Sequence, residues 1–279
     1  GLRFPLYPLF VAPTLLFLLR GLRTRNRNDF LLSGLFLGLG LHGYSPFRIV
    51  PFVVVAAFVL YWLHSRSQDV RKTLPIWLAL LALTSLLVFL PLLRFWLDNP
   101  EMFGFRAFSR LSDIEQPLPG PAHEIFASNV LKGLMMYNFD DGEIWVNSIP
   151  HRPALDIVTG AFFVLGFFLV LVRYVRERHW QDLFLLVSIP LLQLPSTLSL
   201  AFPGENPALN RAGAAYIPAF LLAGMAFDGL LTSLKGGGMR RVLMWALAGI
   251  LLYASASQNY SLVFNTFANS FRQGSWNTS

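Results

Sequence analysis

Long apolar stretches recur along the chain, and a shorter polar link separates each one from the next. Eight of them approach the roughly 20 apolar residues that a helix needs to cross a bilayer. They cover residues 4–19, 30–44, 47–63, 74–95, 157–173, 180–202, 212–233 and 241–257. The pattern predicts an all-α, polytopic transmembrane bundle of about eight spans, with residues 1–279 forming a single transmembrane domain.

The second stretch, 30–44, is the shortest of the eight and contains four glycines. Small residues let helices approach closely in a membrane, which favours a spanning helix at this position. A re-entrant pair of segments formed by residues 30–63 is the alternative interpretation.

The composition restricts the class of protein in the same direction. Hydrophobic residues make up 54% of the chain and charged residues only 13%, against about 25% charged residues in soluble domains. A soluble globular enzyme or a disordered chain would need far more polar surface. The absence of cysteine excludes a disulfide scaffold.

The net charge of +7 is concentrated in alternate links between the spans. Thirteen of the 22 basic residues lie in the links after the first, third, fifth and seventh spans. They are Arg20, Arg23, Arg25, Arg27, Arg66, Arg71, Lys72, Arg173, Arg176, Arg178, Lys235, Arg240 and Arg241. Short basic loops remain in the cytoplasm, so these residues are topology signals and predict no nucleic-acid partner.

The long link 96–156 lies between two of the basic links, so it is expected to be an extracytoplasmic loop. It carries net negative charge. Its segments 101–112 and 122–137 have apolar residues near helical spacing, which predicts two amphipathic helices at the membrane interface. Such helices could form a simple cap over the bundle or a platform beside a groove for a lipid substrate.

The same link contains a cluster of polar side chains that could support chemistry. Its members are Asp140, Asp141, Glu143, Trp145, Asn147 and His151. Clustered carboxylates can supply a base, bind a cation or hold sugar hydroxyls. Aspartate and glycine are also common in turns, and spacing alone favours a plain acidic turn.

Two arginines are predicted at the extracytoplasmic side, where they do not serve as topology signals. Arg48 lies at the mouth of the second and third spans, and Arg211 lies at the start of the seventh. A guanidinium group at this depth is suited to holding a phosphate in bidentate fashion. The alternatives are ordinary contacts with lipid headgroups, or a pair between Arg211 and Glu205.

Four blocks of sequence around these residues resemble a known group of enzymes. They are RNDFLLSGLFLGLGLHGYSPFRIVP (27–51), MYNFDDGEIWVNSIPHRPALDIVTGAFFVLG (136–166), LPSTLSLAFPGENPALNRAGAAYIPAFLLAGMAFDGL (194–230) and, more loosely, GLRFPLYPLF (1–10). The order and content of the blocks resemble bacterial integral-membrane glycosyltransferases of the GT-C class. The branch is the one related to dolichyl-phosphate-mannose protein mannosyltransferases.

The resemblance implies a mannosyltransferase-like enzyme that moves a sugar from a polyprenyl-phosphate carrier to an extracytoplasmic protein, glycan or lipid acceptor. It makes Arg48, Arg211, Tyr44 and Asn210 candidates for holding the carrier phosphate. It makes Asp140, Asp141, Glu143, Trp145, Asn147 and His151 candidates for contacting the sugar or the acceptor. It implies no cofactor, and it leaves a requirement for a divalent metal open.

One feature departs from the pattern of this class. The usual acidic catalytic residue lies in the first outer loop, whereas the link after the first span here is basic and holds only Asp29. The departure predicts that the chain is the C-terminal portion of a longer enzyme, with its base upstream of Gly1 and little activity alone. A polytopic transporter, a lipid-carrier flippase or a non-catalytic membrane scaffold remains the alternative. We expect the protein in the bacterial plasma membrane, surrounded by membrane lipids.

Overall fold

The computed structural model describes residues 3–233 and 238–270, and the regular elements in those ranges are all helical. Helices occur at all the predicted span positions. They are α1 (Leu6–Thr24), α2 (Arg27–Leu41), α3 (Val50–His64), α4 (Gln68–Asp98), α7 (Ile157–Glu177), α8 (Trp180–Thr197), α10 (Tyr216–Ser233) and α11 (Met239–Tyr260). The predicted all-α class is therefore confirmed.

Shorter helices occupy the connections. They are the 3-10 helices η1 (Ser45–Ile49), η2 (Pro203–Glu205) and η3 (Gly213–Ala215), the α-helices α5 (Pro100–Leu111), α6 (Ala122–Met135) and α9 (Leu209–Ala212), and the π-helix η4 (Ser261–Phe267). Proline at Pro46 and Pro203 begins two of the 3-10 helices, where its fixed φ suits a first turn.

Six helical segments among the described residues are long and apolar enough to cross a membrane. They are Leu6–Thr24, Ser45–His64, Gln68–Asp98, Ile157–Glu177, Leu209–Thr232 and Met239–Ser270. Helix α2 has only 15 residues, and α8 has 18 residues interrupted by Pro190 and Pro195. These two helices are also the ones that pack most deeply among their neighbours. The six long apolar segments support an integral membrane protein with at least these candidate spans.

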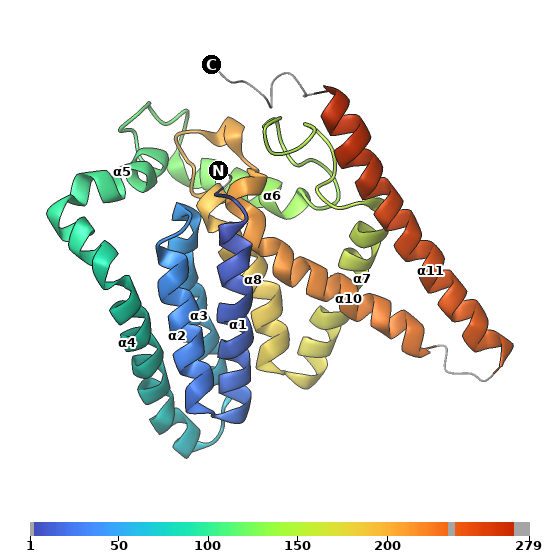
Figure 1. The fold of residues 1–279 in the computed structure, drawn as a ribbon, viewed down its shortest axis with the longest axis horizontal. Helices are drawn as coiled ribbons and strands as arrows, with labels where there is room; N and C mark the ends of the chain where they lie inside the picture. The colour runs from blue at the N-terminus through green and yellow to red at the C-terminus, as the bar shows by residue number, and fades with distance from the viewer. Residues whose placement is uncertain (1–2, 234–237, 271–279) are drawn as a thin grey trace.

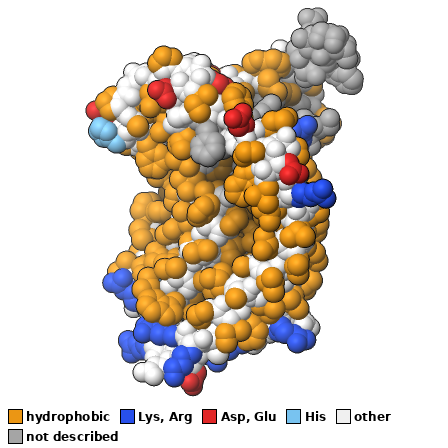
Figure 2. Space-filling model, turned by 90° about the vertical axis from the view of Figure 1, so that its left-hand side faces the viewer, with side chains coloured by type: hydrophobic (Ala, Val, Ile, Leu, Met, Phe, Trp, Pro, Cys, Tyr) orange, Lys and Arg blue, Asp and Glu red, His pale blue; other side chains and the backbone are white. Residues whose placement is uncertain are grey.

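The helices run alternately between two ends of the molecule (Figure 1). Basic side chains gather at one end, below a broad apolar band, and most of the visible acidic side chains lie at the other (Figure 2). We call the first the basic end and the second, which holds residues 99–156 and 198–215, the loop end. Of the predicted topology signals, Lys235 lies outside the described residues.

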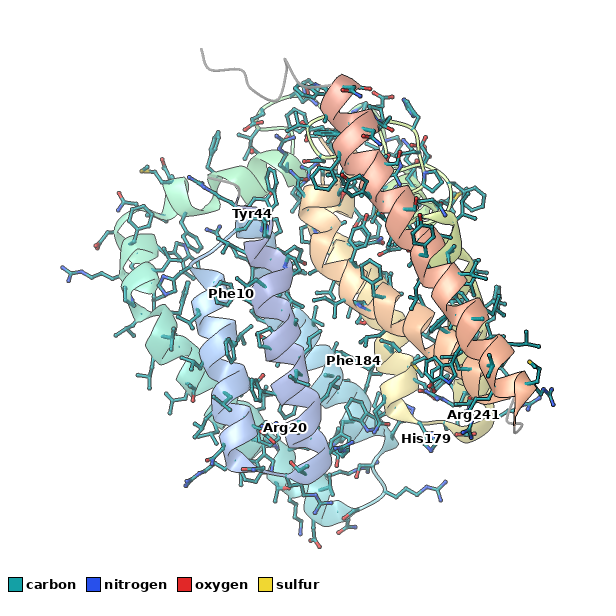
Figure 3. The ribbon with its side chains drawn as sticks, turned by 45° about the vertical axis from the view of Figure 1, so that its right-hand side comes forward. Phe10, Arg20, Tyr44, His179, Phe184 and Arg241 are labelled. Carbon is teal, nitrogen blue, oxygen red and sulfur yellow. The ribbon has the colours of Figure 1, made fainter. Side chains whose placement is uncertain are left out.

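The same ion pair closes two helical hairpins at the basic end. Arg20 Nε donates to Asp29 at 2.8 Å between α1 and α2, and Arg173 Nε donates to Asp182 at 2.8 Å between α7 and α8. Both aspartates are buried. Figure 3 shows Arg20 at this end and Tyr44 at the opposite end. The buried carboxylates are thus paired, as an apolar solvent requires.

Helix α8 joins two apolar cores. Its Leu192 and Phe184 pack with α1–α4, around Tyr7, Phe30 and Phe47. Its Leu186 and Ile189 pack in the second core, which holds side chains of α7 and α10. By contrast, α4 and α11 lie at the outside of the bundle and leave most of their apolar side chains exposed. Those exposed side chains face the surface where lipid would lie.

The predicted interface helices are confirmed as helices, with 101–112 corresponding to α5 and 122–137 to α6. Buried amide groups hold α6 against the loop end of α8. Gln193 Nε2 donates to the Gly133 carbonyl at 2.8 Å, and Asn129 Nδ2 donates to the Thr197 carbonyl at 3.0 Å. Asn206 Nδ2 in turn donates to the Asn129 carbonyl at 2.9 Å, so the segment after η2 is fixed to the same point.

Glycines provide the closest approaches between helices. A Cβ atom on Gly38 of α2 would lie 2.7 Å from the Ser85 carbonyl oxygen of α4. A Cβ atom on Gly166 of α7 would lie only 2.0 Å from the Leu222 carbonyl oxygen of α10. Since backbone atoms cannot move aside as side chains do, these glycines set the spacing of their helix pairs.

Substitution of Gly166 by alanine should separate α7 from α10. We expect Gly166→Ala to lower the free energy of unfolding by about 1–3 kcal/mol, because the added methyl group overpacks a backbone contact. Gly224→Ala is the matched control, since no heavy atom lies within 4 Å of its added Cβ. Denaturant unfolding in detergent checks both variants, and equal stabilities would contradict the proposed close contact.

Candidate functional site

Arg48 lies in η1, at the loop end of α3, and packs against α5. Its Nη1 donates to the Phe103 carbonyl at 2.7 Å, and its guanidinium carbon lies 3.7 Å from the centre of the Phe103 ring. The stacked guanidinium keeps its charge while its faces are shielded. Its Nε is buried without a hydrogen-bond partner among the described residues, so one donor remains unused there.

Arg211 lies in α9 and is the more buried of the two predicted arginines, with 13% of its side chain exposed. Its Nη1 donates to Ser199 Oγ at 3.3 Å, and its Nη2 donates to Glu205 Oε2 at 3.0 Å. The pairing with Glu205 that the sequence left as an alternative is therefore present. Within the described part of the chain, Arg211 Nε has no hydrogen-bond partner.

A third arginine, Arg110, joins this site, and no sequence pattern indicated its role. It lies near the end of α5, and its Nη1 donates to the same Glu205 oxygen at 2.6 Å. Its guanidinium carbon lies 4.0 Å from the centre of the Phe202 ring. In the sequence it was one charged position on an amphipathic helix, and only the fold brings it to Arg211.

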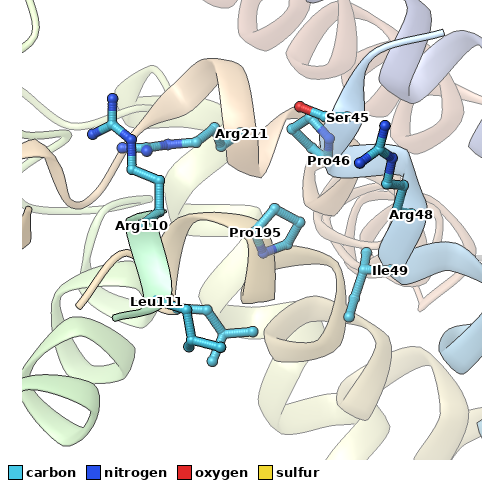
Figure 4. A pocket seen from close by; sticks show the side chains of 9 residues that line it. Ser45, Pro46, Arg48, Ile49, Arg110, Leu111, Pro195 and Arg211 are labelled. Atoms are coloured by element: carbon cyan, nitrogen blue, oxygen red, sulfur yellow. The ribbon is translucent and has the colours of Figure 1, made fainter. Parts of the chain in front are cut away.

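The three arginines line one cavity (Figure 4), which shares Arg110, Arg211, Ser45 and Pro46 with an adjoining cavity. The smaller cavity, about 250 Å³, also has Arg48 and the apolar side chains of Ile49, Leu111, Pro195 and Leu198. The larger, about 750 Å³, also has Tyr44 and Asn210, together with Arg3, Phe4, Phe105, Ser109, Glu115, Ile144 and Glu205. All four predicted phosphate-binding residues therefore line this pair of cavities.

The smaller cavity is mostly apolar and the larger one is more polar, and Arg110 and Arg211 lie where the two adjoin. The larger cavity has the size typical of small-molecule sites, which is about 300–1,000 Å³. Asn210 Oδ1 is buried and has no hydrogen-bond partner in the ranges that the structure describes, so it can accept a hydrogen bond from a ligand. This geometry suits an amphipathic anion whose charged group lies between an apolar part and a polar part.

The acidic cluster forms a closed loop beside this site. The Asp141 amide donates to the Arg152 carbonyl at 2.8 Å, and the His151 amide donates to the Gly142 carbonyl at 3.0 Å. Gly142 has φ +94°, and a Cβ there would lie 2.7 Å from the Pro207 carbonyl oxygen. The turn chemistry expected from the sequence is therefore present and is packed against the segment after η2.

The carboxylates of this loop differ in their environments. His151 Nδ1 lies 3.1 Å from Asp140 Oδ2, and the Gly142 amide donates to Asp140 Oδ1 at 2.8 Å. These hydrogen bonds lower the pKa of Asp140, and the Asp140 carboxylate raises the pKa of His151. Asp141 is buried, which raises its pKa. Asp140 is thus held as an anion, whereas Asp141 binds a proton more readily.

Three of the predicted sugar- or acceptor-binding residues, Asp140, Glu143 and His151, line a third cavity of about 190 Å³. Its other lining residues include Lys132 from α6 and Asn206. Asp141, Trp145 and Asn147 belong to the same loop but do not line this cavity. Asn147 Nδ2 is buried and finds no hydrogen-bond partner among the residues described, so the loop has an unused donor there.

Two chain segments contribute walls to both the large cavity and the third cavity. Ile144 and Glu205 face the large one, while Glu143 and Gly204, their sequence neighbours, face the other. The phosphate and the sugar or acceptor candidates thus lie on opposite sides of a thin wall. Among the described residues, no group of three or more His, Asp or Glu side chains could hold a metal ion.

Comparison of the chain with models of protein families, with curated proteins and with solved structures finds no match in any of the three.

Proposed function

We propose that this protein acts in membrane glycosyl transfer, using a sugar carried on a polyprenyl phosphate and an acceptor on the extracytoplasmic side. One observation carries the proposal. Arg48, Arg110 and Arg211 meet at the loop end, where an apolar cavity joins a larger polar one. The resemblance of the blocks around Arg48, Asp140 and Arg211 to GT-C enzymes supports the same chemistry.

Each part of the site has a counterpart in the substrate. The cavity walled by Ile49, Leu111 and Leu198 accepts the first isoprene units, since burial of apolar surface favours them there. The arginines hold the phosphate and stabilise the negative charge that it gains when the sugar departs. The larger cavity takes the sugar, and the loop of Asp140 and His151, whose Ile144 lines that cavity, forms the wall that faces the acceptor beside it.

The proposed topology follows from the charges at the two ends. We place the basic end in the cytoplasm and the loop end outside the plasma membrane. Helices α2 and α8 are then spans surrounded by other helices, which gives eight spans in total. A short helix is tolerated there because its neighbours, rather than lipid, cover its polar ends.

Substitution of Arg48 or Arg211 should reduce sugar transfer. We expect Arg48→Ala and Arg211→Ala to lower the rate by about 100-fold, as loss of one donor to a developing anion does. The assay expresses the protein together with any sequence encoded upstream of Gly1, gives the membranes a panel of polyprenyl-phosphate-linked hexoses and measures labelled product. Arg211→Lys, which keeps the charge but not the bidentate geometry, should retain more activity than Arg211→Ala.

Arg94→Ala is the matched control for these variants. Arg94 lies near the loop end of α4, its side chain is 88% exposed, and it pairs only weakly with Asp98 at 3.9 Å. Transfer should be unchanged in this variant. Normal transfer by the Arg48 and Arg211 alanine variants, at unchanged protein levels, would refute the assignment of the phosphate site.

Cysteine labelling tests the topology, because the chain has no cysteine of its own. Val146 is exposed at the loop end and Ser67 is exposed at the basic end. A membrane-impermeant maleimide added to intact cells should label Val146→Cys but not Ser67→Cys, and lysis should make both reactive. The opposite pattern would place the site in the cytoplasm.

A further inference from the structure

Glu205 is the acid that occupies the arginine site in the described structure. Its Oε2 accepts from Arg110 Nη1 at 2.6 Å and from Arg211 Nη2 at 3.0 Å. A single carboxylate oxygen therefore bridges two guanidinium groups that come from different segments of the chain. A phosphate oxygen would accept from the same two donors, so the carboxylate and a phosphate compete for one position.

The carboxylate leaves this site with an excess of positive charge. Four guanidinium groups line the two cavities, those of Arg3, Arg48, Arg110 and Arg211, against the carboxylates of Glu115 and Glu205. Among the described residues, Glu205 is the acid that pairs with any of these arginines. Two negative charges against four positive charges leave an excess of positive charge where burial weakens solvation. The phosphodiester of a sugar-linked carrier has one negative charge but two free oxygens that can accept from both arginines, and the monoester left after sugar transfer carries nearly two negative charges and neutralises the cluster better than the carboxylate does.

Both arginines are held in place by contacts that do not involve the Glu205 carboxylate. Arg211 donates to Ser199 Oγ, and the buried Ser199 is fixed close to the end of α8. Arg110 stacks on Phe202, and its backbone carbonyl accepts from the Ala201 amide at 3.0 Å. Departure of the Glu205 carboxylate therefore leaves a preformed pair of donors.

The Glu205 side chain can move away from the two arginines, whereas the neighbouring Asn206 is held in place. It ends the short helix η2, and 38% of its side chain is exposed. Asn206, the next residue, is anchored by Ser196 Oγ at 2.7 Å and by the Asn129 carbonyl. Rotation of the Glu205 side chain toward solvent would thus exchange one ligand for another without moving the rest of the wall.

We propose that Glu205 is an internal competitor for the carrier phosphate, occupying Arg110 and Arg211 until the phosphate of a carrier with an apolar chain displaces it. The inference deepens the proposed function and depends on it. Glu205 then sets specificity, because an anion must gain more from the cluster than the carboxylate does. The isoprene-sized apolar cavity adds binding free energy that free phosphate lacks.

Binding of farnesyl phosphate to the purified chain in phosphatidylcholine nanodiscs tests the inference. We expect Glu205→Gln to tighten this binding by about tenfold, because the apparent affinity is reduced by the fraction of protein whose arginines are occupied. Inorganic phosphate should bind far more weakly than farnesyl phosphate to both proteins. Farnesol, which lacks the phosphate, should bind equally to both.

Glu115→Gln is the matched control for charge. Glu115 lines the same large cavity and makes no ion pair among the described residues. Its substitution removes the same negative charge but no competitor, so it should change the affinity much less than Glu205→Gln does. Equal tightening in the two variants would show a general electrostatic effect and would overturn the inference.

Thermal unfolding provides a readout that a merely structural role of Glu205 would not reproduce. Without ligand, Glu205→Gln should melt below the wild type, since two cations lose their partner. With saturating farnesyl phosphate the two melting temperatures should converge, because the phosphate replaces the carboxylate. A difference that persists with ligand would mean that Glu205 is a structural tie and not a competitor.

The arginine variants separate failure of the inference from failure of the proposed function. If Arg211→Ala weakens binding of farnesyl phosphate but Glu205→Gln does not tighten it, the phosphate site stands and the competitor role falls. If the wild type binds farnesyl phosphate no better than farnesol, both are refuted.

Discussion

A bilayer offers no hydrogen-bond partners, so the backbone within it must satisfy its own polar groups, and the rest of this structure follows from that requirement. The long segments are helical, and the irregular segments are collected at one end of the bundle. The buried carboxylates at the basic end are paired, Asp29 with Arg20 and Asp182 with Arg173. Irregular loops would leave backbone polar groups without partners in the middle of the bundle. The candidate site, which is built largely from loops, therefore lies at the loop end.

Apolar packing alone would not position that loop end, because lipid tails compete equally well for apolar surfaces. Directional hydrogen bonds do so instead. Gln193 and Asn129 join α6 to α8, and Asn206 joins the segment after η2 to α6. The prolines of α8 interrupt its regular pattern close to these contacts. The candidate site is thereby built on a rigid base, with Glu205 as an exposed group beside anchored neighbours.

The prediction from sequence was strongest where one local rule decides the outcome. Apolar length located the helices, and amphipathic spacing located α5 and α6, because both properties are local to the segment. It was weaker where neighbours decide: the span expected at 180–202 ends at Thr197, and α2 reaches only Leu41. Charge and position indicated Arg48 and Arg211, but Arg110 resembled any basic residue on an interfacial helix.

The sequence by itself determined that the chain is helical, that it belongs in a membrane and that its charges divide between two ends. These properties follow from composition and periodicity alone. It also located the acidic loop and two of the arginines. Only the tertiary structure decided which of these residues meet. It brought Arg110 to Arg211 through Glu205, and it separated the loop of Asp140 and His151 from them by a thin wall. The physical reason is that these contacts join segments about 95 residues apart, and their geometry depends on how helices pack rather than on any local pattern.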